Sequence, residues 1–339
     1  MRATPFDPEA DLRHARLAQT VRETILADTR RIIIVGTSGW IGRTAVALLH
    51  EALGPEGFAQ RVACFGSRAN LIDIGEGLAV HQAPLASLAG QDHRPTLLFN
   101  LAFLTMDKIA GMDAADYVRA NRALSATVLA ALEPIGVDRL FLASSGAAVF
   151  TDDTEAKPDQ RLYGGLKRDD EQLFADWALA APDRRRTVIA RIFSVSGPWI
   201  NKHDVYALAS FILDALAGRP VEVRAPMRVW RSYVAVREVV SLVLAELLAE
   251  DGASVTRFDT GGEALELGDV AAKVVQTIGG EVRRCPITSP VDNRYAGDGE
   301  PYAKLLDRHG VSHLPLVDQI VETAAYLARQ SAVERASHD

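Results

Sequence analysis

Short, continuous apolar runs alternate along much of the chain with longer segments in which apolar residues recur at helical spacing. Arg31–Val35 (RIIIV) is the first of these runs, and such a β-branched stretch is typical of a parallel strand buried on both faces. Strands that alternate with helices build βαβ units, so the pattern predicts an α/β fold with a doubly wound, parallel sheet. The other expected strands are 61–65, 96–100, 139–143 and 187–192, and the expected helices include 43–53, 116–132 and 162–181.

The two ends of the chain depart from this alternation. Residues 1–29 are expected to form a helical extension whose default role is packing, with an amphipathic helix over 11–28. After residue 197 the alternation weakens, so 30–197 is expected to be the main domain and 198–339 a smaller α/β lobe, interleaved with returns to the main sheet. Apolar residues on the stripe of the first helix are Leu12, Leu17, Val21 and Ile25. In the lobe, helices are expected at 205–216, 236–248, 269–278 and 316–329, and a strand at 221–224.

Composition narrows the class of protein. The formal net charge of −7 argues against a nucleic-acid-binding surface. No apolar run approaches the length of a membrane span, and no signal peptide is recognisable. Cys64 and Cys285 are far apart and offer neither metal-ligand spacing nor a disulfide framework, as in a reducing compartment. We therefore expect a cytoplasmic protein without a metal site.

A glycine-rich turn follows the first strand. Gly36, Gly39 and Gly42 are spaced as GxxGxxG (GTSGWIG) between that strand and a helix. Glycines here allow the backbone to turn sharply and approach a pyrophosphate, which then lies at the helix N-terminus. The spacing is weak evidence alone, but its position predicts a Rossmann-type domain that binds a dinucleotide.

The end of the second strand bears on which dinucleotide is bound. NAD-selective folds usually have an acidic residue there for the ribose 2′-hydroxyl, whereas an arginine can meet a 2′-phosphate. The chain has Gly66, Ser67 and Arg68 and no carboxylate. The cofactor is thus expected to be NAD or NADP, with NADP favoured, although Arg68 can also be an ordinary loop residue.

Tyr163 and Lys167 lie four residues apart, on one face of an expected helix. A phenol, with a pKa of about 10, exchanges protons near neutrality only if a cation stabilises the phenolate. Lysine can also hold the cofactor's ribose hydroxyls. A pair on a helix surface is the alternative interpretation, but the pair follows a strand that ends in two serines, which favours catalysis.

Taken together, these residues resemble the extended short-chain dehydrogenase/reductases, specifically the NAD-dependent epimerase/dehydratase family of nucleotide-sugar enzymes. The resemblance runs from about Arg31 to Leu327. Besides the turn and the tyrosine–lysine pair, it rests on the segments NLA (100–102), ANRALSATVLAAL with Asn121, RLFLASSGAAVF and RIFSVSGP. VWRSYVAVREVV with Arg231, FDTGG (258–262) and NRYAGD (293–298) match later landmarks.

The candidate site residues follow from the turn, the strand ends and this resemblance. Tyr163, Lys167 and Ser145 are the catalytic candidates. The resemblance implies substrate contacts by Ser194, Arg231 and Tyr295. Arg231 is expected at the phosphates of the substrate and Tyr295 at its base. The candidates for cofactor binding are Gly36, Gly39, Trp40, Ile41, Gly42, Ser67, Arg68, Leu101, Ala102, Asn121, Ser144, Tyr163, Lys167 and Ile192.

Two departures from the family pattern matter. Gly146 stands where a catalytic serine or threonine is usual, so Ser145 becomes the nearest hydroxyl, with Ser144 behind it. Either serine can instead bond the backbone at the strand end. Ser194 replaces the usual substrate-contacting asparagine. The segment after Ser145 also lacks the Asp-Glu pair of the 4,6-dehydratases, which argues against that reaction.

The resemblance implies an NAD(P)-dependent oxidoreductase that acts on a nucleotide-activated sugar, as a 4-epimerase or a 4-ketoreductase. The alternative is a dinucleotide-binding sensor or scaffold that has lost catalysis, for which Gly146 is the supporting feature. A homodimer formed through two helices is also implied.

Overall fold

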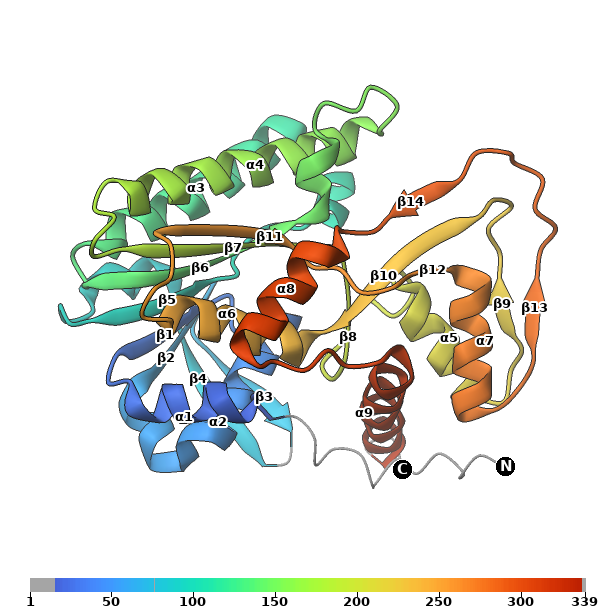
Figure 1. The fold of residues 1–339 in the computed structure, drawn as a ribbon, viewed down its shortest axis with the longest axis horizontal. Helices are drawn as coiled ribbons and strands as arrows, with labels where there is room; N and C mark the ends of the chain where they lie inside the picture. The colour runs from blue at the N-terminus through green and yellow to red at the C-terminus, as the bar shows by residue number, and fades with distance from the viewer. Residues whose placement is uncertain (1–15, 76, 337–339) are drawn as a thin grey trace.

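The computed structural model describes residues 16–75 and 77–336 (Figure 1). Within them the main sheet has eight strands in the order β11-β7-β6-β5-β1-β2-β4-β3. All neighbouring strands run parallel except β3, which is antiparallel to β4. The strands are β1 (Arg31–Val35), β2 (Val62–Gly66), β3 (Asn70–Gly75), β4 (Leu78–Pro84), β5 (Thr96–Asn100), β6 (Val137–Ser145), β7 (Arg186–Ile192) and β11 (Val255–Asp259). The predicted α/β fold is confirmed.

Helices cover both faces of this sheet (Figure 1). The side chains of β1 alternate between two apolar cores, with Ile32 and Ile34 in one and Ile33 and Val35 in the other, which is why the strand is apolar throughout. The first core is covered by α1 (Gln19–Ala27), α2 (Trp40–Arg61), α6 (Val236–Leu248) and α8 (Gly299–His309). The second is covered by α3 (Ala114–Leu132), α4 (Pro158–Leu179) and the 3-10 helix η2 (Leu85–Gly90).

The rest of the chain builds a smaller lobe, at the right of Figure 1. Its core lies between α5 (Ala207–Leu216), α7 (Leu267–Ile278) and α9 (Leu316–Ala336). One small sheet contains β8 (Ser194–Ser196), β10 (Val229–Ala235), β12 (Ala264–Glu266) and β14 (Asn293–Tyr295). A second pairs β9 (Val221–Val223) with β13 (Val282–Arg284). Between these elements the chain returns to the main domain through α6 and β11.

Several predicted boundaries were wrong. Residues 16–18 are not helical, so the first helix begins at Gln19, and residues 11–15 lie outside the described residues. Arg61 ends α2 instead of opening a strand, because the helix continues past a kink at Gly54-Pro55. The α4 helix begins at Pro158, a residue suited to a first turn because it has no N–H to satisfy. The β3–β4 hairpin, α8 and the strands β8 and β10 to β14 were not predicted.

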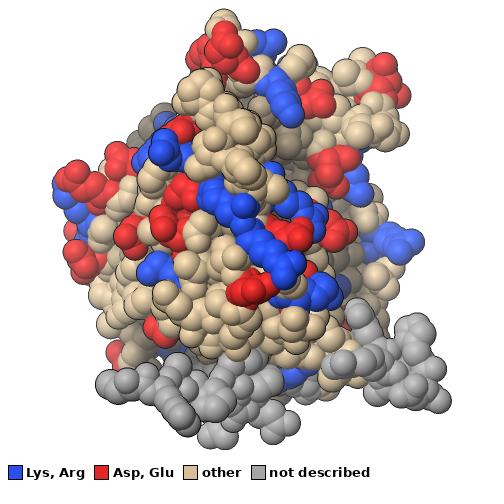
Figure 2. All heavy atoms as spheres, turned by 90° about the vertical axis from the view of Figure 1, so that its right-hand side faces the viewer, with Lys and Arg blue, Asp and Glu red and all other residues tan. Residues whose placement is uncertain are grey.

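No helix in the described part of the chain is long and apolar enough to cross a membrane. The face of the smaller lobe in Figure 2 has a band of basic side chains with acidic ones beside it. Ion pairs of this lobe include Arg224–Glu222 on β9 and Arg283–Glu281 at β13. These pairs bring opposite charges together on this face of the lobe.

Candidate active site

A tight glycine turn joins β1 to α2. Gly36 has a φ of +96°, and a Cβ on it would lie 2.8 Å from the carbonyl carbon of Leu101. A Cβ on Gly42 would lie 2.5 Å from the carbonyl oxygen of Gly36. Neither position accepts a side chain, because the backbone of the turn packs tightly on itself and on Leu101.

The ends of three neighbouring strands meet at this turn. The N–H of Gly36 donates to the carbonyl oxygen of Phe65 (2.8 Å), and the N–H of Leu101 donates to that of Val35 (2.9 Å). Ala102 follows Leu101, and Ser67 and Arg68 are exposed just beyond β2. These candidates for cofactor binding therefore lie around one turn, at the carboxyl edge where doubly wound sheets bind ligands.

The residues present fit a dinucleotide. The described part of α2 begins without a side-chain cap or an acidic residue in its first turn, so the N–H groups there, including those of Ile41 and Gly42, are free to meet an anion. Trp40 is buried and donates from Nε1 to the carbonyl oxygen of Pro198 (2.7 Å), which ties the turn to the loop after β8. The first turn of α2 is therefore electrostatically suited to a pyrophosphate.

Three hydroxyl groups converge where β6 ends. The Ser145 Oγ lies 3.4 Å from the hydroxyl of Tyr295 and accepts from the N–H of Ala147 at 3.2 Å. Burial raises the pKa of Tyr163 above its usual value of 10, and a hydrogen bond with Ser145 partly offsets this effect. The structure thus brings Ser145, Tyr163 and Tyr295 together from β6, α4 and β14.

Lys167 lies one helical turn beyond Tyr163 and is buried. Its Nζ donates to the carbonyl oxygen of Ala143 (2.8 Å) and lies 3.8 Å from the centre of the Phe103 ring. The same ring meets Tyr163 edge-to-face, with 5.7 Å between the ring centres. Burial lowers the pKa of Lys167 to about 8, although Asp170 and Glu171 act in the opposite direction. Phe103, which was not predicted, contacts both Tyr163 and Lys167.

Behind the pair lies a buried ionic cluster. The Ser144 hydroxyl donates to Oε1 of Glu171 (2.6 Å), and Arg191 donates to both oxygens of the same carboxylate (2.8 and 2.7 Å). The Nε of Arg257 also lies 3.2 Å from Oε2 of this carboxylate. Ser144 therefore links β6 to α4, and its contact with the cofactor stays a prediction. Glu171 was not predicted, although its place four residues after Lys167 puts it on the same side of the helix.

Phe193 accounts for the glycine at position 146. A Cβ on Gly146 would lie 2.5 to 2.7 Å from three atoms of the Phe193 ring. The ring also packs on Tyr295, with 4.9 Å between ring centres, and Phe150 stacks on Tyr295 at 5.9 Å. An aromatic cluster of Phe150, Phe193 and Tyr295 fills the volume that a side chain at 146 would need.

Asn121 holds the loop that follows β5. Its Oδ1 accepts from the N–H of Leu104 (2.8 Å), and its Nδ2 donates to the carbonyl oxygens of Leu104 (3.4 Å) and Tyr117 (3.3 Å). Ile192 is in register with Ser145 in the sheet, and Ser194 is in register with Tyr233 in the smaller lobe. Asn121 thus holds the loop that carries Phe103 through hydrogen bonds to its backbone. Ile192 lies beside Ser145, which with Tyr163 and Tyr295 forms the hydroxyl cluster.

Arg231 and Tyr295 are opposite each other on β10 and β14. The guanidinium lies 5.7 Å from the Tyr295 ring centre and donates to Asn293 Oδ1 (2.9 Å) and the Trp230 carbonyl oxygen (2.8 Å). No carboxylate within the described residues forms an ion pair with it. Arg231 is therefore a half-buried cation beside the hydroxyl cluster, available for an anionic ligand.

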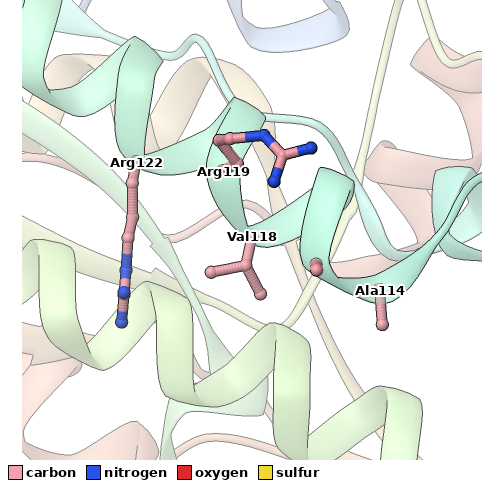
Figure 3. A pocket seen from close by; sticks show the side chains of 5 residues that line it. Ala114, Val118, Arg119 and Arg122 are labelled. Atoms are coloured by element: carbon pink, nitrogen blue, oxygen red, sulfur yellow. The ribbon is translucent and has the colours of Figure 1, made fainter.

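A surface hollow of ≈ 530 Å³ lies beside α3 (Figure 3). Ala114, Ala115, Val118, Arg119 and Arg122 line it, and none of them is a predicted site residue. In Figure 3, Val118 and Arg122 point toward α4. The hollow is separate from the hydroxyl cluster. No group of metal-ligating side chains is found in residues 16–75 and 77–336.

The model of the NAD dependent epimerase/dehydratase family matches residues 32–260, more than half of the chain. The chain belongs to this family. No match is found among the curated proteins.

Solved structures of the same fold include an epimerase from Methanothermobacter thermautotrophicus, with 14% identity, a TM-score of 0.68, and coverage of 94% of this chain and 98% of that one. A UDP-glucose 4-epimerase from Thermotoga maritima, solved with UDP-glucose, is similar with 19% identity, a TM-score of 0.66, and coverage of 89% and 99%. The dTDP-glucose 4,6-dehydratase DesIV from Streptomyces venezuelae, solved with NAD, has 18% identity, a TM-score of 0.65, and coverage of 89% and 98%. At these identities the likeness establishes the fold.

Proposed function

We propose that the protein is an NAD(P)-dependent enzyme that oxidises or reduces a carbon–oxygen bond of a nucleotide-activated sugar, as a 4-epimerase or a 4-ketoreductase. The observation that carries this proposal is that Tyr163 packs on Phe103, in the segment that Leu101 ties to the glycine turn, and that Ser145 moderates the pKa of Tyr163. The similar structures that hold UDP-glucose or NAD support the class of ligand.

In this proposal Tyr163 is the general acid and base at a sugar hydroxyl or carbonyl oxygen. Bound NAD(P) would accept a hydride from the sugar carbon or deliver one to it. Ser145 would donate its single O–H to the reacting oxygen when a substrate is bound. Without a substrate it lowers the pKa of Tyr163 and so partly offsets the effect of burial. Because desolvation raises the pKa of this half-buried phenol, its deprotonation also depends on a cation nearby.

Lys167 is the cation placed for that role. Its pKa of about 8 keeps it mostly protonated at pH 7, and its ammonium already has a carbonyl and an aromatic face as partners. Movement of the Phe103 ring would open the Nζ toward ribose hydroxyls. We propose that Asn121 governs this movement through the backbone of Leu104.

Arg231 is the proposed partner of the substrate diphosphate. It is a cation without an ion pair in the described chain, and guanidinium groups bind phosphate oxygens in a bidentate manner. Its partners, Asn293 and the Trp230 carbonyl, would hold it in place. Tyr295 was expected at the base, but its hydroxyl lies beside Ser145, so we propose that it and Ser194 contact the part of the substrate between the diphosphate and Tyr163.

The site favours a catalytic protein over the sensor or scaffold. The absent hydroxyl at Gly146 was the feature that supported lost catalysis. Phe193 fills that volume, while Ser145 and Tyr295 supply two hydroxyls next to Tyr163. The segment after Ser145 has no Asp-Glu pair, so dehydration is not proposed.

The proposed assembly is a homodimer formed through α3 and α4, in the cytoplasm. The hollow on α3 is lined by small and apolar residues flanked by Arg119 and Arg122 (Figure 3), which suits packing against another helix. Sedimentation velocity on the wild type and on Val118→Glu tests it. A dimer that dissociates in the variant supports the assembly, and a monomeric wild type contradicts it.

The reaction is tested by nucleotide analysis and product analysis. Protein purified without added cofactor is analysed by mass spectrometry, then incubated with UDP- and dTDP-sugars and their 4-keto forms. Retained NAD with interconversion of two epimers indicates an epimerase. Consumption of added NADPH with reduction of a keto sugar indicates a reductase. If neither nucleotide binds, the proposal is wrong.

A further inference from the structure

The last residue of β2, Gly66, lies under the side chain of a neighbouring strand. A Cβ on Gly66 would be 2.2 to 2.3 Å from three atoms of the Gln82 amide group. Gln82 belongs to β4, which pairs with β2 and matches Gly66 with Pro84. The volume next to Gly66 is therefore filled by an amide from β4.

This position has a known importance in dinucleotide-binding folds. NAD-selective sites have a carboxylate at the end of the second strand, which accepts hydrogen bonds from the ribose hydroxyls and repels a 2′-phosphate. Gly66 cannot supply one, and any acidic side chain there would overlap Gln82. The neutral amide stands close to where the carboxylate group would be.

The hydrogen bonds of Gln82 support a role in binding. The side chain is buried, with 4% exposed, and its Nε2 donates to the carbonyl oxygen of Arg68 at 3.0 Å. Its Oε1 is buried and has no hydrogen-bond partner among the described residues. Leaving a buried acceptor unsatisfied is destabilising, so a donor from a ligand hydroxyl would stabilise the site.

We infer that Gln82 replaces the ribose-binding carboxylate and determines which nucleotide this site accepts. Its amide offers an acceptor to the adenosine ribose without adding a negative charge. By holding the Arg68 carbonyl it also fixes the loop that presents the Ser67 hydroxyl and the Arg68 guanidinium. The site accordingly tolerates a 2′-phosphate. This inference rests on the proposed function, since it requires a dinucleotide at the glycine turn.

Gln82→Glu is the direct test, because it introduces a carboxylate with almost no change of volume. Dissociation constants for NAD and NADP are measured by isothermal titration calorimetry on the wild type, on Gln82→Glu and on His81→Glu. His81 is the neighbouring residue on β4 and is exposed, so it controls for added charge. We expect the wild type to bind NADP at least as tightly as NAD. We expect Gln82→Glu to shift the ratio of the two constants toward NAD by about tenfold or more, and His81→Glu to leave it within about twofold.

A second pair of variants covers the case in which a buried glutamate prevents folding. Gly66→Asp alone is expected to lower the midpoint of thermal unfolding, because its side chain overlaps Gln82. Gly66→Asp with Gln82→Gly is expected to recover that midpoint and to prefer NAD. An unchanged NADP-to-NAD ratio in Gln82→Glu, or in the double variant, overturns the inference while leaving the proposed function intact. A wild type that binds neither nucleotide overturns both.

Discussion

The hydroxyl of Tyr295 lies 3.4 Å from the Oγ of Ser145, although 150 residues separate them in the chain. This contact joins β14 of the smaller lobe to the end of β6 in the main sheet. Ser145 also partly offsets the effect of burial on the pKa of Tyr163, so it acts on two phenols. The smaller lobe thus contributes directly to the orientation of the catalytic candidate.

Tyr295→Phe removes this contact and keeps the aromatic packing. If Tyr295 acts by orienting Ser145, the rate of hydride transfer should fall by about tenfold or less, the value of one hydrogen bond of about 0.5–1.5 kcal/mol. The midpoint of thermal unfolding and the affinity for NAD(P) should remain close to those of the wild type. Ser145→Ala combined with Tyr295→Phe should be no slower than Ser145→Ala alone, because both changes remove one unit. Additive losses would contradict this role.

Gly146→Ala tests the packing of Phe193. The new Cβ would overlap the ring, and overpacking of this kind costs about 1–3 kcal/mol of folding free energy. Gly111→Ala is the control, because a Cβ there meets nothing within 4 Å. Urea unfolding should show the loss in the first variant and little change in the second. Equal stability of the two variants would mean that Phe193 does not explain the glycine.

Glu171→Ala should be among the most destabilising changes in α4. It leaves Arg191 without its bidentate partner and Ser144 without its acceptor, and loss of one member of a buried ion pair costs about 3–5 kcal/mol. Asp169→Ala removes an exposed carboxylate from the same helix and should cost about 1 kcal/mol or less. Urea unfolding of both variants gives the two values. Similar values would show that the cluster contributes little.

The burial of Lys167 predicts a dependence of stability on pH. Its pKa is about 8 in the folded protein, below the usual 10.5, so between these values the unfolded chain binds more protons than the folded protein. The contribution of Lys167 to the free energy of unfolding therefore rises as the pH increases from about 8 to 10.5. The difference in stability between wild type and Lys167→Met, from urea unfolding, should grow in favour of the wild type over this range. A constant difference would contradict the low pKa.

Features that depend on neighbours in the chain could be predicted from the sequence. The glycine turn was recognised because positive φ and close approach restrict its positions to glycine. Tyr163 and Lys167 were recognised because a spacing of four places both on one side of a helix. The helix over Val236–Leu248 and the strand over Arg31–Val35 were predicted with correct bounds, since their apolar patterns are long or continuous.

Features that depend on long-range packing could not be predicted. Gly146 looked like a lost hydroxyl because nothing in the sequence indicated that Phe193 would occupy its volume. Gln82 resembled any polar residue of a strand, and its place over Gly66 follows only from the pairing of β4 with β2. The β3–β4 hairpin was missed because its strands have exposed polar residues and pack on one side only.

The central claim is that Tyr163 exchanges a proton while a bound nicotinamide exchanges a hydride with a nucleotide sugar. It is tested most directly by mixing the protein, loaded with NAD or NADP, with individual UDP- and dTDP-sugars and following the fluorescence of the reduced nicotinamide in a single turnover. We expect the signal to rise with at least one sugar in the wild type, and to be slower by about 10²–10⁴-fold in Tyr163→Phe, whose affinity for the cofactor should be unchanged. Equal rates in the two proteins, or a loaded wild type that no sugar nucleotide reduces, would contradict the account.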